Sequence, residues 1–434
     1  MKVLLVFPGL DFEVAYPLGL AAVAGALLAA GHEVVGVDVA LDGLVALDNA
    51  LKKVVPDVVG IAIWTPGFTQ AAACVRRVRA AGTARLLLGG PHASLQPERT
   101  LLDLGADAVV VGDGEAVAVE ILDAWARGQP PVDIAGCVWR SGQIAVVEQP
   151  RKPVNVDVLG CPDRTVFDPR RYPHAWARAA PHATPVVTSR GCPRSCAHCP
   201  SPVLSGGRWR ARSVHAVVDE MRGLPDYVGH VLIEDEHPTV DRRRWLALCR
   251  AIEDAQLGRT WSCPNGLRAE TLDGEVVQAM AAAGCTGVAL GVESADDEML
   301  KRLGRCSLDE VFAAAAACRD VGIEVTAYFV LGLPGARRRA PLQQLRAARR
   351  MGASGAHFSL YAPLPGAAWG DAPAAPARLG WVRSALYLGF YGDPRVLVQA
   401  LRAGHAGLAD VPAAVAQLRA WLSYGGRPRA GSPT

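Results

Sequence analysis

Short apolar runs alternate with amphipathic stretches from the first residue of this chain. Runs rich in Val, Ile and Leu predict strands, and the stretches between them, with apolar residues three or four positions apart, predict helices. This alternation is typical of βαβ units and a parallel sheet. The N-terminal strands predicted in this way are Lys2–Phe7, Glu33–Val39, Asp57–Trp64, Arg85–Leu88 and Ala106–Val111, and the helices are Leu18–Ala30, Leu44–Val54, Thr69–Ala81, Pro97–Leu104 and Ala116–Ala126.

Together these elements predict one open, doubly wound (Rossmann-like) α/β domain. A hairpin over Cys137–Arg140 and Ile144–Glu148 is expected to follow it, with its turn at Ser141-Gly142. The dinucleotide-binding pattern G-x-G-x-x-G is absent, because the chain reads PGLDFEVAYPLGL after its first strand. The fold alone therefore leaves the ligand of this domain open.

The alternation resumes after a stretch rich in Pro, Arg and Asp that we interpret as a linker. Six consecutive βα units predict a partial (β/α)6 barrel, with its chemistry at the C-terminal ends of the strands. Its predicted strands are Val186–Ser189, His230–Glu234, Thr260–Cys263, Gly287–Val292, Val325–Leu331 and Ala356–Tyr361, and its helices include Ser213–Arg222, Asp241–Ala255, Asp273–Ala283 and Ser307–Val321. We predict domains at 1–150 (Rossmann-like), 151–183 (linker), 184–365 (barrel), 366–424 (helical segment, with helices near Trp381–Tyr391 and Arg395–Ala403) and 425–434 (disordered tail).

Composition narrows the possible partners. The formal net charge is only +3, and no Lys/Arg-rich run concentrates it, so we expect a small-molecule substrate and no nucleic acid. The apolar run Val3–Phe7 is too short for a secretory signal, and Gly25 interrupts the apolar stretch Ala21–Ala30, so no membrane span is predicted. We expect a cytoplasmic monomer, in which cysteines are thiols or metal ligands rather than disulfides.

Three cysteines form the sharpest motif in the chain. The sequence GCPRSCAHC places Cys192, Cys196 and Cys199 in a C-x3-C-x2-C spacing directly after a predicted strand. Three thiolates on one loop can bind three irons of a [4Fe-4S] cubane and leave the fourth iron open to a ligand. Zinc would need a fourth protein ligand, and the nearest candidate, His198, is adjacent to Cys199 and points the wrong way. The remaining cysteines are scattered and fit small buried hydrophobic residues.

The triplet resembles the signature of radical S-adenosylmethionine (SAM) enzymes, in which the amine and carboxylate of SAM bind the open iron. The resemblance implies cleavage of SAM to a 5′-deoxyadenosyl radical, with an electron from a flavodoxin- or ferredoxin-like reductant. The segments IEDEHPTVD, CPNGLRAETLD, LGVESADDEMLKRLGR and FVLGLPG follow successive predicted strands and resemble SAM-binding segments of that family. The SAM-binding residues implied are His198, in place of the usual aromatic residue, Asp235 and Glu236 near the SAM amino group, Asn265, Arg268, Glu293, Ser294, Gly332 and Gly335.

Four N-terminal segments resemble the cobalamin-binding domain that precedes the barrel in a large subfamily of radical SAM proteins. They begin YPLGLAAVAGALL, VVGIAIWTPGF, LLLGGPHAS and VVVGDGEAV. The D-x-H-x-x-G segment that supplies a histidine to cobalt is absent, so Trp64 either covers the lower corrin face or is a core aromatic residue. The cobalamin-binding residues implied are Tyr16, Pro17, Leu18, Gly19, Trp64, Thr65, Pro66, Gly89, Gly90, Pro91, Gly112, Asp113, Gly114 and Glu115.

The resemblance implies methylation of an unactivated carbon or phosphorus through methylcobalamin. Ring closure, ring contraction or oxidative cyclisation of a tetrapyrrole is an alternative, and a non-catalytic cobalamin or cluster sensor is another. A tRNA methylthiotransferase would need a second set of three cysteines, but only Cys74 and Cys137 precede residue 150. Near the C-terminus, Trp381, Tyr387, Phe390 and Tyr391 lie at helical spacing, and they either pack on the barrel or line the substrate cavity.

Overall fold

The computed structural model describes residues 1–9, 15–82, 84–172, 174, 176, 180 and 182–396. These residues form two compact units, one built mainly from Met1–His174 and the other mainly from Val187–Pro200 and the described residues after Ala216. The predicted tail, and all of the helix predicted at Arg395–Ala403 beyond Val396, lie outside the described residues.

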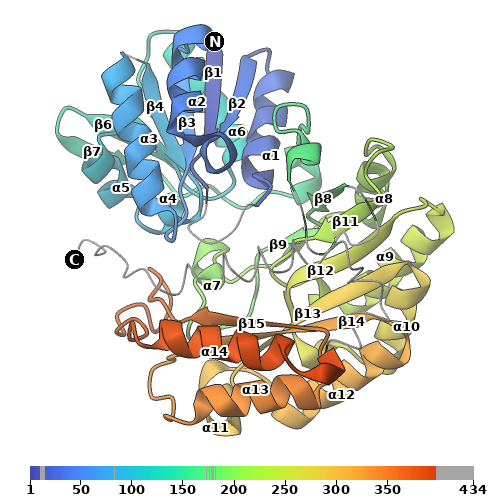
Figure 1. Ribbon diagram of the computed structural model, residues 1–434. Helices are drawn as coiled ribbons and strands as arrows, with labels where there is room; N and C mark the ends of the chain where they lie inside the picture. The colour runs from blue at the N-terminus through green and yellow to red at the C-terminus, as the bar shows by residue number, and fades with distance from the viewer. Residues whose placement is uncertain are drawn as a thin grey trace. The chain divides into compact units, whose positions relative to one another are not determined.

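A seven-stranded sheet forms the first unit. Its strands are β1 (Lys2–Phe7), β2 (Glu33–Asp38), β3 (Val58–Ala62), β4 (Arg85–Gly89), β5 (Ala108–Val110), β6 (Cys137–Ser141) and β7 (Ile144–Val147). Their order in the sheet is β2-β1-β3-β4-β5-β6-β7 (Figure 1). Strands β1 to β5 pair in parallel, and β6 and β7 add an antiparallel hairpin. The strand order reverses at β1, which is where a doubly wound sheet opens a crevice between the loops after β1 and β3.

Helices cover both faces of this sheet, and the sequence of β1 shows why. Val3, Leu5 and Phe7 belong to one apolar core, whereas Leu4 and Val6 belong to the other, because successive side chains of a strand point to opposite faces. An unbroken apolar run therefore suits a strand that is buried on both sides. The helices are α1 (Leu18–Ala29) and α6 (Gly114–Ala126) with the first core, α2 (Val39–Val54), α3 (Phe68–Ala81) and α5 (Pro97–Leu104) with the second, and the short α4 (Pro91–Leu95), which the sequence analysis missed.

A second sheet provides the partial barrel. Its strands are β8 (Ala183–Val186), β11 (His230–Ile233), β12 (Thr260–Leu267), β13 (Cys285–Glu293), β14 (Glu324–Leu331) and β15 (Gly355–Leu360), in the order β15-β14-β13-β12-β11-β8. Strands β11 to β15 pair in parallel, as predicted. The prediction for the first strand is wrong by three residues, because β8 ends at Val186, and Thr188 and Ser189 bond instead to a carboxylate described below.

Helices alternate with these strands. They are α8 (Val214–Arg222), α9 (Arg242–Ala255), α10 (Gly274–Ala282), α11 (Asp297–Leu303), α12 (Leu308–Asp320) and α13 (Ala340–Arg350). The second unit also contains the short strand β9 (Ser189–Arg190) and the short helices η3 (Pro238–Val240) and η4 (Ala269–Thr271). The short elements η1 (Val156–Leu159), η2 (Pro169–Arg171), α7 (Ser201–Leu204) and β10 (Arg210–Ala211) belong to the first unit. Among the described helices, none combines the length and apolarity needed to cross a bilayer.

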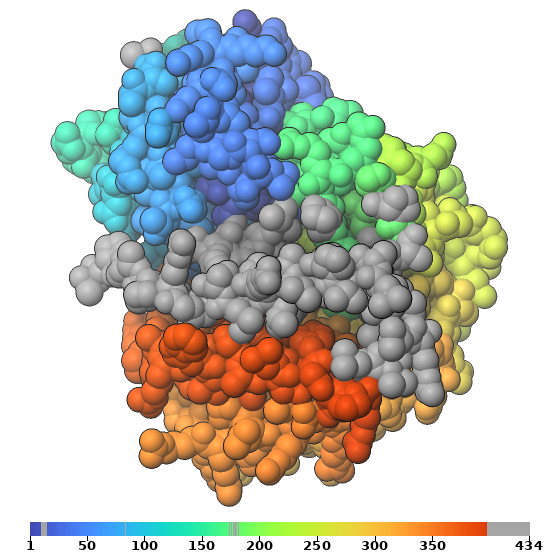
Figure 2. Space-filling model, viewed as in Figure 1, coloured from blue at the N-terminus to red at the C-terminus, as the bar shows by residue number. Residues whose placement is uncertain are grey.

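Helix α14 (Leu379–Tyr391) follows the barrel and packs on β15 and α13 (Figures 1 and 2). Phe390 is fully buried there and Tyr387 is 5% exposed, so the packing interpretation holds for both residues. It is wrong for Trp381, whose side chain is 74% exposed. The Tyr387 hydroxyl accepts a hydrogen bond from the Phe358 backbone N–H at 3.1 Å, and the Tyr391 hydroxyl lies 3.3 Å from the Ala356 N–H.

Candidate active site

The three cysteines of the motif lie on one loop of the second unit, which we call the cluster loop (residues 191–200). Cys192, Cys196 and Cys199 are half-buried thiols, and the Cys199 N–H donates to the Cys196 carbonyl at 3.1 Å. Burial raises the pKa of Cys192, and the neighbouring Cys196 and Cys199 thiols add to the rise. No three His, Cys, Asp or Glu side chains within the described ranges converge on one metal ion. A cubane does not require that, because each cysteine binds a different iron.

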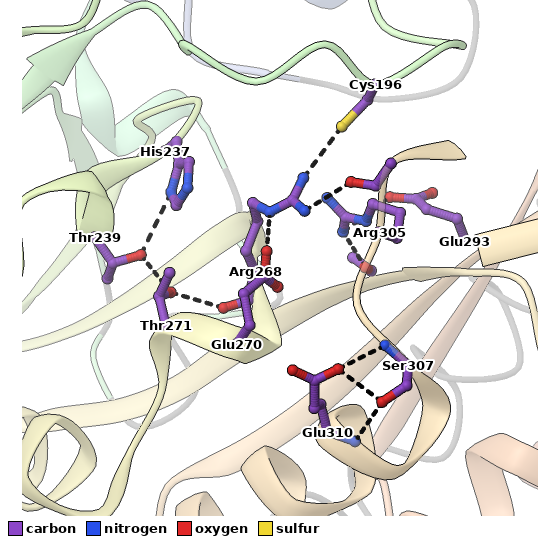
Figure 3. A network of polar contacts seen from close by, with 12 residues as sticks. Cys196, His237, Thr239, Arg268, Glu270, Thr271, Glu293, Arg305, Ser307 and Glu310 are labelled. Carbon is purple, nitrogen blue, oxygen red and sulfur yellow. Dashed lines mark hydrogen bonds and ion pairs between the residues drawn. The ribbon is translucent and has the colours of Figure 1, made fainter. Parts of the chain in front are cut away.

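The guanidinium of Arg268 lies against the cluster loop (Figure 3). Its Nη1 lies 3.2 Å from the Cys196 sulfur, its Nε lies 2.5 Å from Glu270, and its Nη2 donates to the Gly304 carbonyl at 2.8 Å. The Arg268 side chain is only 7% exposed, so its charge acts in a medium that screens weakly. The structure therefore brings this residue, predicted to bind SAM, against the cluster loop, where it offsets the negative charge of thiolate ligands.

Glu293 ends β13 with a strained backbone. Its φ is +64°, an unusual value for a residue with a Cβ, and such strain is concentrated at functional sites. Arg305 lies 3.2 Å from one Glu293 oxygen and His198 lies 3.8 Å from the other. The structure thus brings together His198 and Glu293, which are 95 residues apart in the sequence. Ser294 is 2% exposed, and its hydroxyl accepts from the Asp296 N–H at 3.2 Å.

The paired acids after β11 are tied to the chain that leads into the cluster loop. Asp235 accepts from the Thr188 N–H at 2.6 Å, from the Thr188 hydroxyl at 2.7 Å and from the Ser189 hydroxyl. Glu236 accepts from the Gly191 N–H at 3.1 Å. Nearby, the Asn265 amide donates to the Glu234 carbonyl at 2.9 Å. Asp235 therefore anchors the cluster loop, and its contact with the SAM amino group stays a prediction.

We expect the Asp235→Asn substitution to flatten part of the pH dependence of stability. Burial raises the pKa of Asp235 from 3.8 to about 6. The folded protein thus holds the Asp235 proton more tightly than the unfolded chain does. The contribution of this proton to the free energy of unfolding is therefore complete below about pH 4 and is lost as the pH rises through about 6. Denaturant unfolding at about pH 4.5 and about pH 7 measures the difference. The exposed control Asp254→Asn should keep the slope of the parent protein, and an unchanged slope in Asp235→Asn would contradict the assignment.

The loop between β11 and η3 also contains His237, which the sequence did not single out. His237 is 2% exposed, its Nδ1 lies 3.4 Å from the Thr239 hydroxyl, and its Nε2 has no hydrogen-bond partner among the described residues. Burial, together with the nearby Arg268, lowers the pKa of His237 to about 4. The only available signal was its position directly after the paired acids.

Gly332 and Gly335 follow β14 with φ values of +77° and +78°. A Cβ on Gly332 would lie 2.7 Å from the Ala375 side chain, and one on Gly335 would lie 2.7 Å from the Arg302 guanidinium. Both positions therefore favour glycine for conformation, and Gly332 also requires it for space, whereas the flexible Arg302 side chain could move away from a Cβ at position 335. They lie at the C-terminal end of a barrel strand, which is where the sequence analysis placed them.

In the first unit, the loops after β3 and β4 carry the residues predicted to bind cobalamin. Trp64 is 44% exposed, so it is not a core aromatic residue. The Thr65 hydroxyl lies 3.1 Å from Nδ1 of His92, which follows Pro91 in α4. Gly90 has a φ of +93°, and a Cβ there would lie 2.9 Å from the Ile63 backbone. The β4 loop is thus packed tightly against the β3 loop, whereas the Trp64 ring remains accessible to a ligand.

Other predicted cobalamin residues are occupied by packing within this unit. The Tyr16 hydroxyl donates to the Phe167 carbonyl at 3.0 Å, and Asp113 forms an ion pair with Arg210 at 2.7 Å. Glu115 is 3% exposed in the first turn of α6. The remaining positions lie at the start of α1 (Pro17, Leu18, Gly19), in the β3 loop (Pro66), at the end of β4 (Gly89) and around the start of α6, where Gly114 is the first helical residue and the Gly112 N–H donates to the Ser94 hydroxyl at 3.0 Å.

Comparisons with known proteins agree with the predicted families of both the barrel and the N-terminal domain. Residues 186–340 match the radical SAM superfamily, and residues 12–122 match the B12 binding domain. An uncharacterised methyltransferase of Pyrococcus horikoshii is 29% identical over 84% of this chain and 82% of its own length. The cytidylyl-2-hydroxyethylphosphonate methyltransferase of Streptomyces wedmorensis is 26% identical over 81% and 76%. The structure of the radical SAM methyltransferase TsrM from Kitasatospora setae, with cobalamin and a [4Fe-4S] cluster, superposes with a TM-score of 0.72 at 20% identity and covers 85% of this chain and 77% of TsrM.

Proposed function

This chain belongs to the radical SAM superfamily and carries a B12-binding domain ahead of its radical SAM domain, and from that premise we propose that it methylates an unactivated carbon, or a phosphorus, of a small molecule. The observation that carries the proposal is the cluster loop, which carries three cysteine thiols and where the buried guanidinium of Arg268 contacts Cys196. A B12-binding domain in the same chain favours transfer of the methyl group through cobalamin. We expect a flavodoxin- or ferredoxin-like protein to supply the electron.

The residues at the cluster loop have separate roles in binding and orientation. Cys192, Cys196 and Cys199 would hold a [4Fe-4S] cluster, which with SAM and cobalamin supplies reductive SAM cleavage and methyl transfer. Arg268 offsets thiolate charge and fixes the position of Cys196. Asp235 fixes the backbone that enters the loop. None of these side chains has to transfer a proton, so their contribution is binding and orientation.

The proposal is tested with SAM that carries deuterium in its methyl group. The full chain, loaded anaerobically with iron, sulfide and hydroxocobalamin, is mixed with this SAM and a chemical reductant. We expect 5′-deoxyadenosine by liquid chromatography and the deuterated methyl group on the extracted corrinoid. Formation of 5′-deoxyadenosine without label on the corrinoid would overturn methyl transfer and leave radical chemistry of another kind. Absence of both products would overturn the proposal as a whole.

We expect the Trp64→Ala substitution to weaken cobalamin binding about tenfold without unfolding the first unit. The ring is 44% exposed, so truncation should change stability by less than about 1 kcal/mol. Losing an aromatic contact of about 1.5 kcal/mol with the corrin corresponds to the expected fall in affinity. Equilibrium dialysis of hydroxocobalamin measures it. Trp64→Phe should retain most of the affinity, and Val45→Ala, at a 70% exposed position of α2, should retain all of it. Equal affinity in Trp64→Ala and the parent protein would exclude this contact.

A further inference from the structure

The buried imidazole of His237 offers one ring nitrogen that the described residues leave unused. The side chain is 2% exposed and lies in the loop between β11 and η3, three residues after the Glu234 carbonyl that holds Asn265. A buried polar atom without a partner costs free energy, so such an atom in a cofactor-binding region points to a ligand. Its environment also fixes what kind of ligand atom it can take.

Figure 3 shows the hydrogen bonds that link His237 to Thr239 and Thr271. Because each hydroxyl has only one proton to donate, these bonds determine the tautomer of the His237 ring. The Thr271 hydroxyl lies 2.7 Å from the Arg268 carbonyl, which can only accept, so Thr271 spends its one proton there. Thr271 must then accept from the Thr239 hydroxyl, 2.7 Å away. With its own proton donated, Thr239 can only accept from His237 at 3.4 Å. Nδ1 of His237 therefore carries the proton, and Nε2 presents a bare lone pair.

The imidazole stays neutral, which keeps Nε2 an acceptor. Burial is the main cause of its lowered pKa, and the positive charges of Arg268, Arg194 and Arg305 act in the same direction against the opposing Glu270. The site thus selects a hydrogen-bond donor and rejects an acceptor such as a carboxylate. Because Thr239 and Thr271 link the ring to the Arg268 backbone, the lone pair is fixed relative to the residue that contacts Cys196.

The neighbouring acids make this acceptor more significant. Asp235 was expected near the SAM amino group, but its two oxygens already accept from Thr188 and Ser189. One Glu236 oxygen accepts from Gly191. A cofactor that places N–H or O–H groups beside this loop needs an acceptor. The second oxygen of the exposed Glu236 can also accept, and Nε2 of His237 adds a buried acceptor that the described residues leave unused.

We propose that Nε2 of His237 accepts a hydrogen bond from a donor group of bound SAM, either its amino group or a ribose hydroxyl. The proposal rests on the proposed function only in that SAM binds at the cluster loop. His237 is a positioning residue for the cofactor and takes no part in electron or methyl transfer.

Equilibrium binding of S-adenosylhomocysteine to the cluster-loaded full chain tests this without turnover. His237→Phe should weaken binding about tenfold, because one lost neutral hydrogen bond is worth about 1.4 kcal/mol. His237→Gln should recover most of that affinity, because its side-chain oxygen can occupy the position of Nε2. The control Asp254→Asn changes an exposed acid of the same unit and should leave affinity unchanged.

Analogues of S-adenosylhomocysteine identify the donor. Analogues lacking the amino group, the 2′-hydroxyl or the 3′-hydroxyl are compared on the parent protein and on His237→Phe. The analogue that lacks the bonded group should lose about tenfold on the parent and nothing further on the variant, a coupling that a general packing defect would not give. If no analogue couples to His237→Phe, the proposal is overturned, even when the parent protein forms 5′-deoxyadenosine and the proposed function stands. If the parent itself binds no S-adenosylhomocysteine, both proposals fail together.

Nitrogen-15 NMR of histidine-labelled protein gives a readout that is independent of affinity. We expect Nε2 of His237 to resonate as an unprotonated nitrogen and to shift when S-adenosylhomocysteine binds. Thr239→Val removes the acceptor for the Nδ1 proton and should return the ring to a mixture of tautomers. His230, whose two ring nitrogens lie 2.8 Å from Thr260 and 2.9 Å from Ser262, should not respond to the ligand and is the internal control. A protonated Nε2 in the free protein would overturn the proposal.

Discussion

Replacing Cys196 by alanine is expected to reduce 5′-deoxyadenosine formation by more than about 100-fold. A cubane held by three cysteines loses one iron ligand in this variant, and even substitutions outside the ligand shell of a metal cost about 10–100-fold. Iron per chain and the EPR spectrum of the reduced, anaerobically prepared protein should fall together with the activity. The Cys196 side chain is half-buried, so the fold itself should survive the truncation.

Cys161→Ala provides the matched control, because this thiol is exposed and lies in the first unit. It should keep the iron content, the EPR spectrum and 5′-deoxyadenosine formation of the parent protein. Turnover that persists in Cys196→Ala would remove the cluster loop from the chemistry, and an equal loss in Cys161→Ala would show that the effect is not specific to the loop.

Replacing Arg268 by methionine should lower the free energy of unfolding by about 3 kcal/mol. The substitution leaves Glu270 without its cation, and removing one partner of a largely buried ion pair typically costs about 3–5 kcal/mol. It also removes the positive charge beside the Cys196 sulfur, so a cluster bound there should become harder to reduce. Denaturant unfolding measures the first effect, and a redox titration followed by EPR measures the second.

Two further variants separate the charge from the packing. In the double variant Arg268→Met with Glu270→Gln, the unpaired carboxylate is gone and part of the stability should return, whereas the change in potential should remain. Arg242 offers the contrast, because its ion pairs with Asp273 and Glu275 are exposed, and Arg242→Met should have little effect on stability. A potential that is unchanged in Arg268→Met would contradict the role of its charge.

Local patterns in the sequence were sufficient for the architecture. The apolar run Lys2–Phe7 and the cysteine spacing each express their structure within a few residues, so the strand and the cluster loop could be predicted from them. Helix α11 was missed although its signals are local, with Asp296 as N-cap and a left-handed Gly304 after the last turn. The short helix lies within the segment LGVESADDEMLKRLGR, which was interpreted as a SAM-binding segment and not as a helix.

What could not be predicted depends on contacts between distant residues. Thr188 and Ser189 continue an apolar run and were predicted as part of the first barrel strand. That strand ends at Val186, and both residues bond instead to Asp235, 47 and 46 residues away, with Ser189 beginning the separate short strand β9. The tautomer of His237 depends on a hydroxyl 34 residues further on, at Thr271. The exposure of Trp64 depends on the packing around the end of β3, and the hydrophobic pattern of the sequence does not indicate it.

The two tyrosines of α14 do more than fill space. Within the described part of the chain, strand β15 has no neighbour in the sheet on its outer side, and an edge of unpaired N–H and C=O groups readily pairs with another strand. The hydroxyls of Tyr387 and Tyr391 occupy backbone positions at Phe358 and Ala356 that a seventh strand would otherwise use. At these two positions of the described edge, a side chain bonded to the backbone thus takes the place that a further strand would use.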